Sequence, residues 1–89
     1  MLHAIIPFKS PSSILHRLKD ADVRYFFHDE EAGSIFLVSY EGTTGELAKL
    51  VGLSKEQNTS SGVVLAFDNY AGFANPDIWE WLRKYDDNY

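Results

Sequence analysis

The 89-residue chain contains no cysteine, which excludes a disulfide framework and a zinc site built on thiolates. Basic residues are also few, since 8 Lys and Arg stand against 13 Asp and Glu, for a formal charge of −5. Because a phosphate backbone attracts positive charge, we do not expect direct binding to nucleic acid. The charge suits a basic protein partner, or serves solubility alone.

Long apolar runs are missing as well. The opening stretch MLHAIIPFKSP has neither the basic leader of a signal peptide nor the apolar length of a membrane span. We therefore expect a cytoplasmic protein without a membrane segment. Hydrophobic residues make up 45% of the chain and aromatic residues 15%, which is typical of a folded domain. The length allows one domain, residues 1–89.

The start of the chain predicts a strand followed by a helix. Apolar residues alternate between the two sides of residues 2–8, with Pro7 expected to leave the strand unpaired at its end. Ser10 is a suitable helix cap and Pro11 suits the first helical position, and an apolar stripe then continues to Ala21. We expect a short amphipathic helix.

A hairpin follows. VRYFFH at residues 23–28 and SIFLVSY at residues 34–40 are rich in aromatic and β-branched side chains, which favour strands. The acidic turn between them contains Gly33, which tolerates a positive φ angle.

The next segment predicts a second helix and a last strand. Thr43 and Glu46 have the spacing of a capping box, and Gly52 marks the end of the helix. After a polar loop, the run VVLAF at residues 63–67 has no polar alternation. We expect it to be a strand covered on both faces.

The chain then predicts a last helix, with Asn75 as cap and Asp77 near its positive end. Trp81 belongs to the apolar face of this helix. Trp79 stands roughly 200° away around the helix axis, so we expect it on the opposite side. One tryptophan is thus a candidate contact for another chain.

The predicted order is strand, helix, strand, strand, helix, strand, helix. It is the α+β, ferredoxin-like β-α-β-β-α-β pattern: a four-stranded antiparallel sheet with two helices on one face, extended by a C-terminal helix. Such a sheet leaves its other face and its edges bare, and the terminal helix can cover one of them.

The turn DNYAGFAN displays Tyr70 and Phe73 or packs them beneath the bend. Both interpretations remain open, because aromatic side chains are enriched in cores and at protein interfaces alike. As the interface hypothesis, the candidate interaction residues are Tyr70, Phe73, Trp79 and Arg83.

No residue pattern predicts a catalytic or metal site. His28 is followed by three acidic residues, yet consecutive residues at a hairpin tip rarely converge on a cation, and a solvated turn is favoured. His3 and His16 have no partner at metal-ligand spacing. The helix start GTTGE lacks the lysine of a phosphate-binding loop, and the serines lack companions for nucleophilic catalysis. We expect no cofactor.

From Val23 onward, two stretches, VRYFFHDEEAGSIFLVSYEGTTGELAKLVGL and GVVLAFDNYAGFANPDIWEWL, resemble the small ferredoxin-like proteins related to the CRISPR-associated spacer-integration subunit. The resemblance implies the fold and a homodimer that pairs through edge strands or terminal segments. Relatives with metal-dependent nuclease activity carry an Asp at the end of the first strand. Here that place holds Pro7 and Phe8, so oxygen ligands for a cation are missing.

The leading hypothesis is a non-catalytic adaptor or inhibitor that acts by protein contact and self-associates. A divergent metal-dependent nuclease is the first alternative. The second is an anti-defence protein of a mobile element that occupies a nucleic-acid-binding surface of its target.

Overall fold

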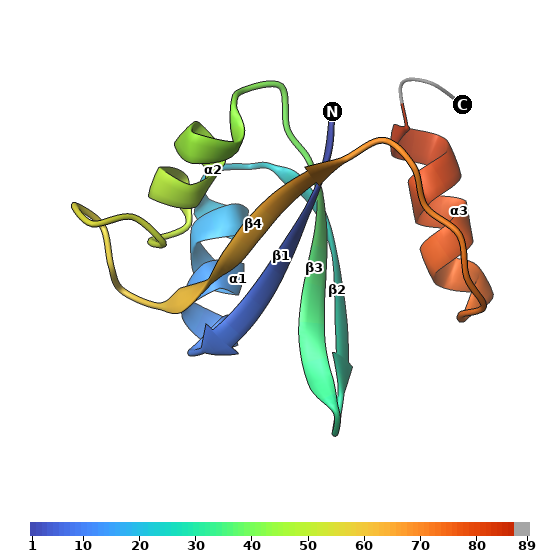
Figure 1. Ribbon diagram of the computed structural model, residues 1–89, viewed down its shortest axis with the longest axis horizontal. Helices are drawn as coiled ribbons and strands as arrows, with labels where there is room; N and C mark the ends of the chain where they lie inside the picture. Colours follow the sequence, from blue (N-terminus) through green and yellow to red (C-terminus); the bar gives the residue numbers. More distant parts are fainter. Residues whose placement is uncertain (87–89) are drawn as a thin grey trace.

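The computed structural model describes residues 1–86, and its elements follow the order predicted from the sequence. The strands are β1 (Leu2–Lys9), β2 (Arg24–Glu30), β3 (Gly33–Ser39) and β4 (Ser61–Phe67), and the helices are α1 (Pro11–Asp20), α2 (Thr44–Leu50) and α3 (Pro76–Tyr85). The fold is α+β and ferredoxin-like, with an added C-terminal helix (Figure 1).

The four strands form one antiparallel sheet in the order β2-β3-β1-β4, so β2 and β4 are its edges. In the register, Ile5 of β1 lies opposite Phe36 of β3 and Val64 of β4. Pairing with β3 ends at Ile5, whereas pairing with β4 continues past Pro7 to Lys9. The prediction that the strand is unpaired at Pro7 is therefore confirmed on the β3 side and wrong on the β4 side, where Pro7 lies opposite Gly62.

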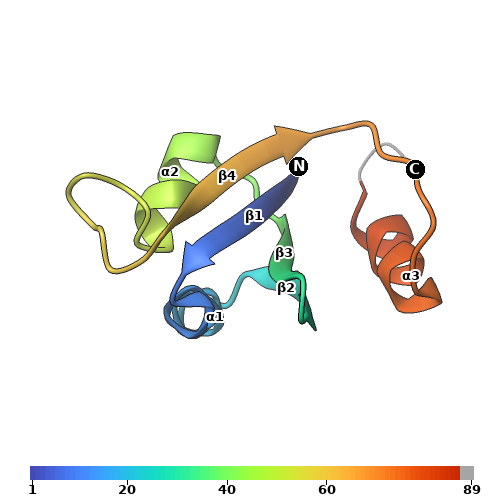
Figure 2. The same ribbon diagram turned by 60° about the horizontal axis from the view of Figure 1, so that its bottom comes forward.

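Helices α1 and α2 cover one face of the sheet (Figure 2). They do so because their apolar residues recur at helical spacing and form one stripe each. The fully buried core consists of Ile5, Ile14, Leu18, Phe36, Val38, Leu47 and Val51. Each such side chain contributes roughly 1.5–3 kcal/mol by its burial, so this layer holds the domain together.

Helix α3 packs against the opposite face, on the other side of the sheet from α1 and α2 (Figures 1 and 2). Its Leu82 is buried with Leu2 of β1 and Leu37 of β3. The sheet is thus the middle of three layers. The expectation that the last helix covers a bare part of the sheet is confirmed, and the helix covers the face rather than an edge.

The ends of α2 follow the sequence prediction. Thr43 Oγ1 accepts the Glu46 amide at 3.1 Å, and the Glu46 carboxylate accepts the Thr43 amide at 3.1 Å, which completes the capping box. The Thr43 backbone amide, and after it the Thr43 side chain, lower the pKa of Glu46 by hydrogen bonding to its carboxylate. At the other end Gly52 has φ 84°, and the Leu53 amide donates to the Ala48 carbonyl at 2.8 Å. This is a Schellman stop, which needs glycine.

The two remaining helix starts differ from each other. Asn75 Oδ1 accepts the Asp77 amide at 3.0 Å, so the predicted cap of α3 is confirmed. Ser10 precedes Pro11 as predicted, but its side chain caps nothing. Its backbone lies in the left-handed region, with φ 52°, and only its carbonyl contacts the helix, accepting the Ser13 amide at 3.1 Å.

Among residues 1–86, no helix has the length and apolar character needed to cross a membrane.

Candidate interaction surface

Strand β4 corrects the sequence prediction. Its uninterrupted apolar run was expected to be covered on both faces, but β4 is an edge strand, with Val63 41% and Leu65 48% exposed. On the face of the sheet that α1 and α2 cover, Val64 packs against the main core. The prediction is wrong because the cluster beneath α3 includes Phe67 but neither Val63 nor Leu65.

Helix α3 covers only one end of that face. Leu2 pairs with Phe67, and both pack in the cluster beneath α3. Two residues before Phe67 on β4 is Leu65, and two residues before that is Val63, which lies opposite Ile6. Leu65 and Val63 are exposed, so α3 does not cover this part of the face.

Val63 and Leu65 are exposed, and Ile6, which lies opposite Val63, is half-buried. We define the sheet patch as Ile6, Phe8, Val63 and Leu65. Phe8 lies between Pro7 and Lys9, where the register with β4 is irregular, and is 71% exposed. Exposed apolar side chains on neighbouring strands make the sheet patch a candidate interaction site.

The two tryptophans, Trp79 and Trp81, are both partly buried. Trp79 stacks on Tyr70, with 6.2 Å between ring centroids, and Trp81 lies 6.4 Å from Phe26 of β2. Both are partly buried against the layer that contains Leu82. The expectation that Trp79 points away from the core is therefore wrong: α3 lies with Leu82 at the centre of its contact, and the large indoles reach the sheet layer on either side.

The four residues expected to form an interface differ in how far they are buried. Tyr70 and Trp79 belong to the packed layer, and the Tyr70 hydroxyl donates to Asp86 Oδ2 at 2.7 Å. Phe73 is fully exposed in the connection between β4 and α3, and Arg83 is exposed on α3. Phe73 and Arg83 are thus exposed, whereas Tyr70 and Trp79 are half-buried. Trp81, expected as a core residue, does pack on the second layer.

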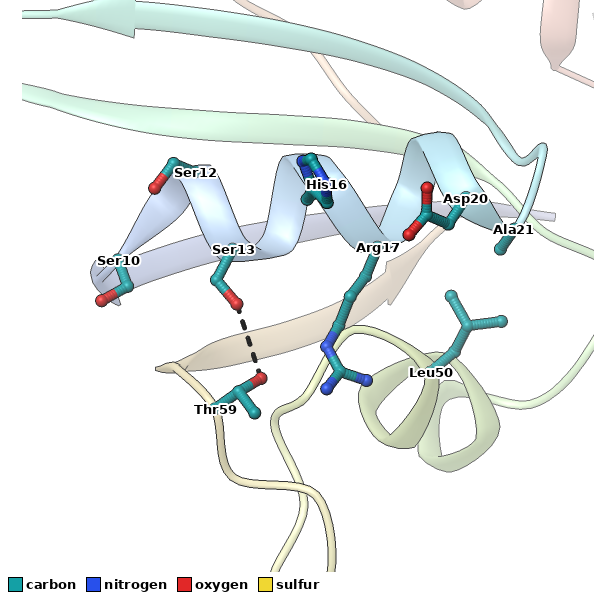
Figure 3. Close-up of a pocket in the computed structure, with 9 residues that line it drawn as sticks. All are labelled: Ser10, Ser12, Ser13, His16, Arg17, Asp20, Ala21, Leu50 and Thr59. Carbon is teal, nitrogen blue, oxygen red and sulfur yellow. Dashed lines mark hydrogen bonds between the residues drawn. The ribbon is translucent and has the colours of Figure 1, made fainter.

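An open groove of about 870 Å³ runs between α1 and the loop before β4 (Figure 3). Ser13 Oγ donates to Thr59 Oγ1 at 3.5 Å across it, and the Arg17 side chain extends toward the same loop. Within residues 1–86 the Arg17 guanidinium forms no ion pair, and no hydrogen bond joins His16 to a serine. The groove has a cation and hydroxyls but no activated nucleophile.

The acidic hairpin tip is satisfied internally. His28 Nε2 lies 2.8 Å from Glu30 Oε1, and the Ser34 hydroxyl donates to Asp29. Across the part of the chain that the structure describes, no three His, Asp or Glu side chains gather where they could hold a metal ion.

His3 is the one buried polar side chain among residues 1–86, fully enclosed between the sheet and α2. Its Nε2 lies 3.4 Å from Thr44 Oγ1, and its ring meets Tyr40 edge-on at 6.2 Å. Burial lowers the pKa of His3, the Met1 backbone opposes that shift, and the positive Met1 amino group adds to it. Burial thus favours the neutral form of the His3 imidazole.

Comparison of the chain with protein-family models, with curated proteins and with solved structures gives no match. The likeness to proteins related to the CRISPR-associated spacer-integration subunit stays a prediction from residue patterns.

Sequence reasoning missed the sheet patch, although a signal for it exists. In the β-α-β-β-α-β pattern the last strand pairs only with the first, which makes it an edge. An edge strand leaves one row of its backbone groups unpaired, whatever its hydrophobicity. The order of the elements therefore predicts the open edge of β4, whereas the exposure of the Val63 and Leu65 side chains depends on where α3 lies.

Proposed function

We propose that this protein is a non-catalytic interaction module, an adaptor or inhibitor that binds another protein chain through the sheet patch. The observation that carries the proposal is the exposure of Val63 and Leu65, 41% and 48%, on an edge strand that contains no charged residue. Leaving such side chains in water costs roughly 25 cal/mol per Å² of apolar surface, which contact with a partner recovers.

The formal charge of −5 supports a partner that is basic around an apolar centre. Opposite charge at the rim of an interface accelerates association, while the apolar centre supplies most of the affinity. A cytoplasmic location belongs to the same proposal. The anti-defence alternative uses this contact too, and differs in giving the acidic surface the larger role.

The nuclease alternative has no comparable support, since the nearest group of possible ligands, at the hairpin tip, is held by its own hydrogen bonds.

The test compares three purified tagged proteins: the wild type, Leu65→Ser and Phe73→Ser. Each is used to capture partners from cells, and every captured protein is then purified and titrated by calorimetry. We expect Leu65→Ser to weaken binding at least tenfold. Phe73→Ser tests the other candidate, the turn after β4, and because Phe73 lies outside the sheet patch we expect this variant to bind like the wild type. Equal binding by wild type and Leu65→Ser would remove the sheet patch from the proposal.

The salt dependence of binding distinguishes the adaptor or inhibitor from the anti-defence alternative. Exposed charges are screened within about 8 Å at physiological ionic strength. If the acidic surface dominates, affinity falls steeply between low and high salt; if the sheet patch dominates, affinity changes little.

A further inference from the structure

We propose that the outer edge of β4 pairs with the same edge of a second copy of this chain, antiparallel, about a two-fold axis at Val64. The inference rests on the proposed function, because it names one partner for the surface that includes Val63 and Leu65. It adds what an exposed apolar area alone does not give, namely the orientation and the register of the contact.

One backbone hydrogen bond between the residues that adjoin β1 and β3 shows which backbone groups of β4 lack a partner in the sheet. The Tyr40 amide donates to the Met1 carbonyl at 3.0 Å, so β1 directs the backbone groups of its odd residues toward β3 and those of its even residues toward β4. The β1–β4 register then directs the odd residues of β4 inward. The N–H and C=O groups of Gly62, Val64 and Ala66 point to the free edge.

These three residues are self-complementary. With Val64 opposite Val64 of the second copy, Gly62 lies opposite Ala66, and both pairs exchange N–H to O=C hydrogen bonds. Val63 lies opposite Leu65 on the face of the sheet patch. Every pair across the axis is small or apolar, and a two-fold axis makes each contact occur twice.

The other edge of the sheet shows the contrast. Strand β2 carries Arg24, Asp29 and Glu30, all exposed, and charged edges resist pairing with another strand. Strand β4, SGVVLAF, has no charge and no proline. Among the strands of residues 1–86, only β4 is an edge without such protection.

Charges at the ends of β4 favour the antiparallel direction. Lys9 lies opposite Ser61 at the start of the strand, and Asp68 follows its last residue. Both are exposed. Antiparallel pairing brings Asp68 of one copy to the end where the other copy has Lys9, whereas a parallel arrangement would place like charges together.

The proposed contact between the two β4 edges buries little surface. A standard stable interface buries about 1,600 Å² in total, and one strand edge buries less, so we expect a dimer at roughly 100 µM that dissociates near roughly 1 µM.

The absence of cysteine allows a direct test of the register. Val63→Cys protein is mixed at high concentration with size-tagged Leu65→Cys protein and oxidised mildly. Residues in a non-hydrogen-bonded pair have Cα atoms about 4.5 Å apart, within the range of a disulfide. We expect the mixed product to exceed either homodimer at least fivefold. Phe73→Cys, exposed but outside the strand, measures random collision.

A second variant tests the edge without touching the sheet. Ala66→Pro removes an N–H that points away from β1, so the folded monomer keeps its own bonds. We expect sedimentation to show a monomer at the concentration where the wild type is a dimer, with a thermal midpoint within a few degrees of the wild type. If Ala66→Pro does not fold, the cysteine pair alone decides.

The outcomes separate this inference from the proposed function. A wild type that stays monomeric, or cysteine products at the Phe73→Cys level, overturns self-pairing. Predominant Leu65→Cys homodimer overturns the register. In either case the proposed function survives if a different protein binds the wild type and not Leu65→Ser.

Discussion

The indole of Trp79 stacks on the ring of Tyr70, with 6.2 Å between the ring centroids and 26° between the ring planes. Tyr70 in turn meets Phe67 edge-on at 5.8 Å. These contacts hold the connection that follows β4 against α3 and fix the position of the helix over one end of the sheet. The same placement leaves Val63 and Leu65 uncovered.

Removing Trp79 should destabilise the domain as much as removing Trp81, because both indoles pack in the second layer. We expect Trp79→Ala and Trp81→Ala each to lower the free energy of unfolding by about 2–4 kcal/mol, measured by chemical denaturation. Phe73→Ala, which loses no intramolecular packing, should change it by less than about 0.5 kcal/mol. A Trp79 variant as stable as the wild type would contradict the packing of α3.

The stability of the fold should depend on pH through His3. Burial lowers the pKa of His3 below its usual 6.5, so the unfolded chain binds the proton more readily than the folded one. This contribution is complete above pH 6.5 and is lost as the pH falls from there toward the folded-state pKa. We expect His3→Gln to flatten the dependence in denaturation curves between pH 5 and pH 7. Phe73→Ala, at an exposed position without a titratable group, should leave the slope unchanged.

Two glycines should respond in opposite directions to alanine. At Gly52, φ is 84° and a Cβ would collide with Thr59 Oγ1, so Gly52→Ala should cost about 1–2 kcal/mol. At Gly45, inside α2, a Cβ meets only Thr43 Oγ1 at 4.0 Å, and Gly45→Ala should add about 0.5 kcal/mol. Thermal melting of the pair tests this, and destabilisation by both would contradict the described helix ends.

Local chemistry explains what could be predicted from the sequence. The capping box of Thr43 and Glu46, the stop at Gly52 and the cap at Asn75 depend on residues a few positions apart, and the structure has all of them. The order of strands and helices follows from the same short-range patterns. Ser10 is the exception, because the turn out of β1 demands a left-handed backbone that removes its side chain from the helix.

The sheet patch could not be predicted in the same way. Whether Trp79 or Val63 is buried depends on where α3 lies across the sheet, and that position depends on contacts between distant residues such as Tyr70 and Trp79. Helical spacing alone placed Trp79 outside, and hydrophobicity alone placed Val63 and Leu65 inside.

Amide hydrogen exchange of β4 at low and high protein concentration tests the central claim most directly. The Val63 amide points to β1 and should be protected throughout, whereas the Val64 and Ala66 amides point to the free edge. We predict that the exchange of Val64 and Ala66 slows at least tenfold at high concentration and stays slow in a complex that uses this edge. Exchange at Val64 that is independent of concentration would contradict the pairing of β4 with a second copy.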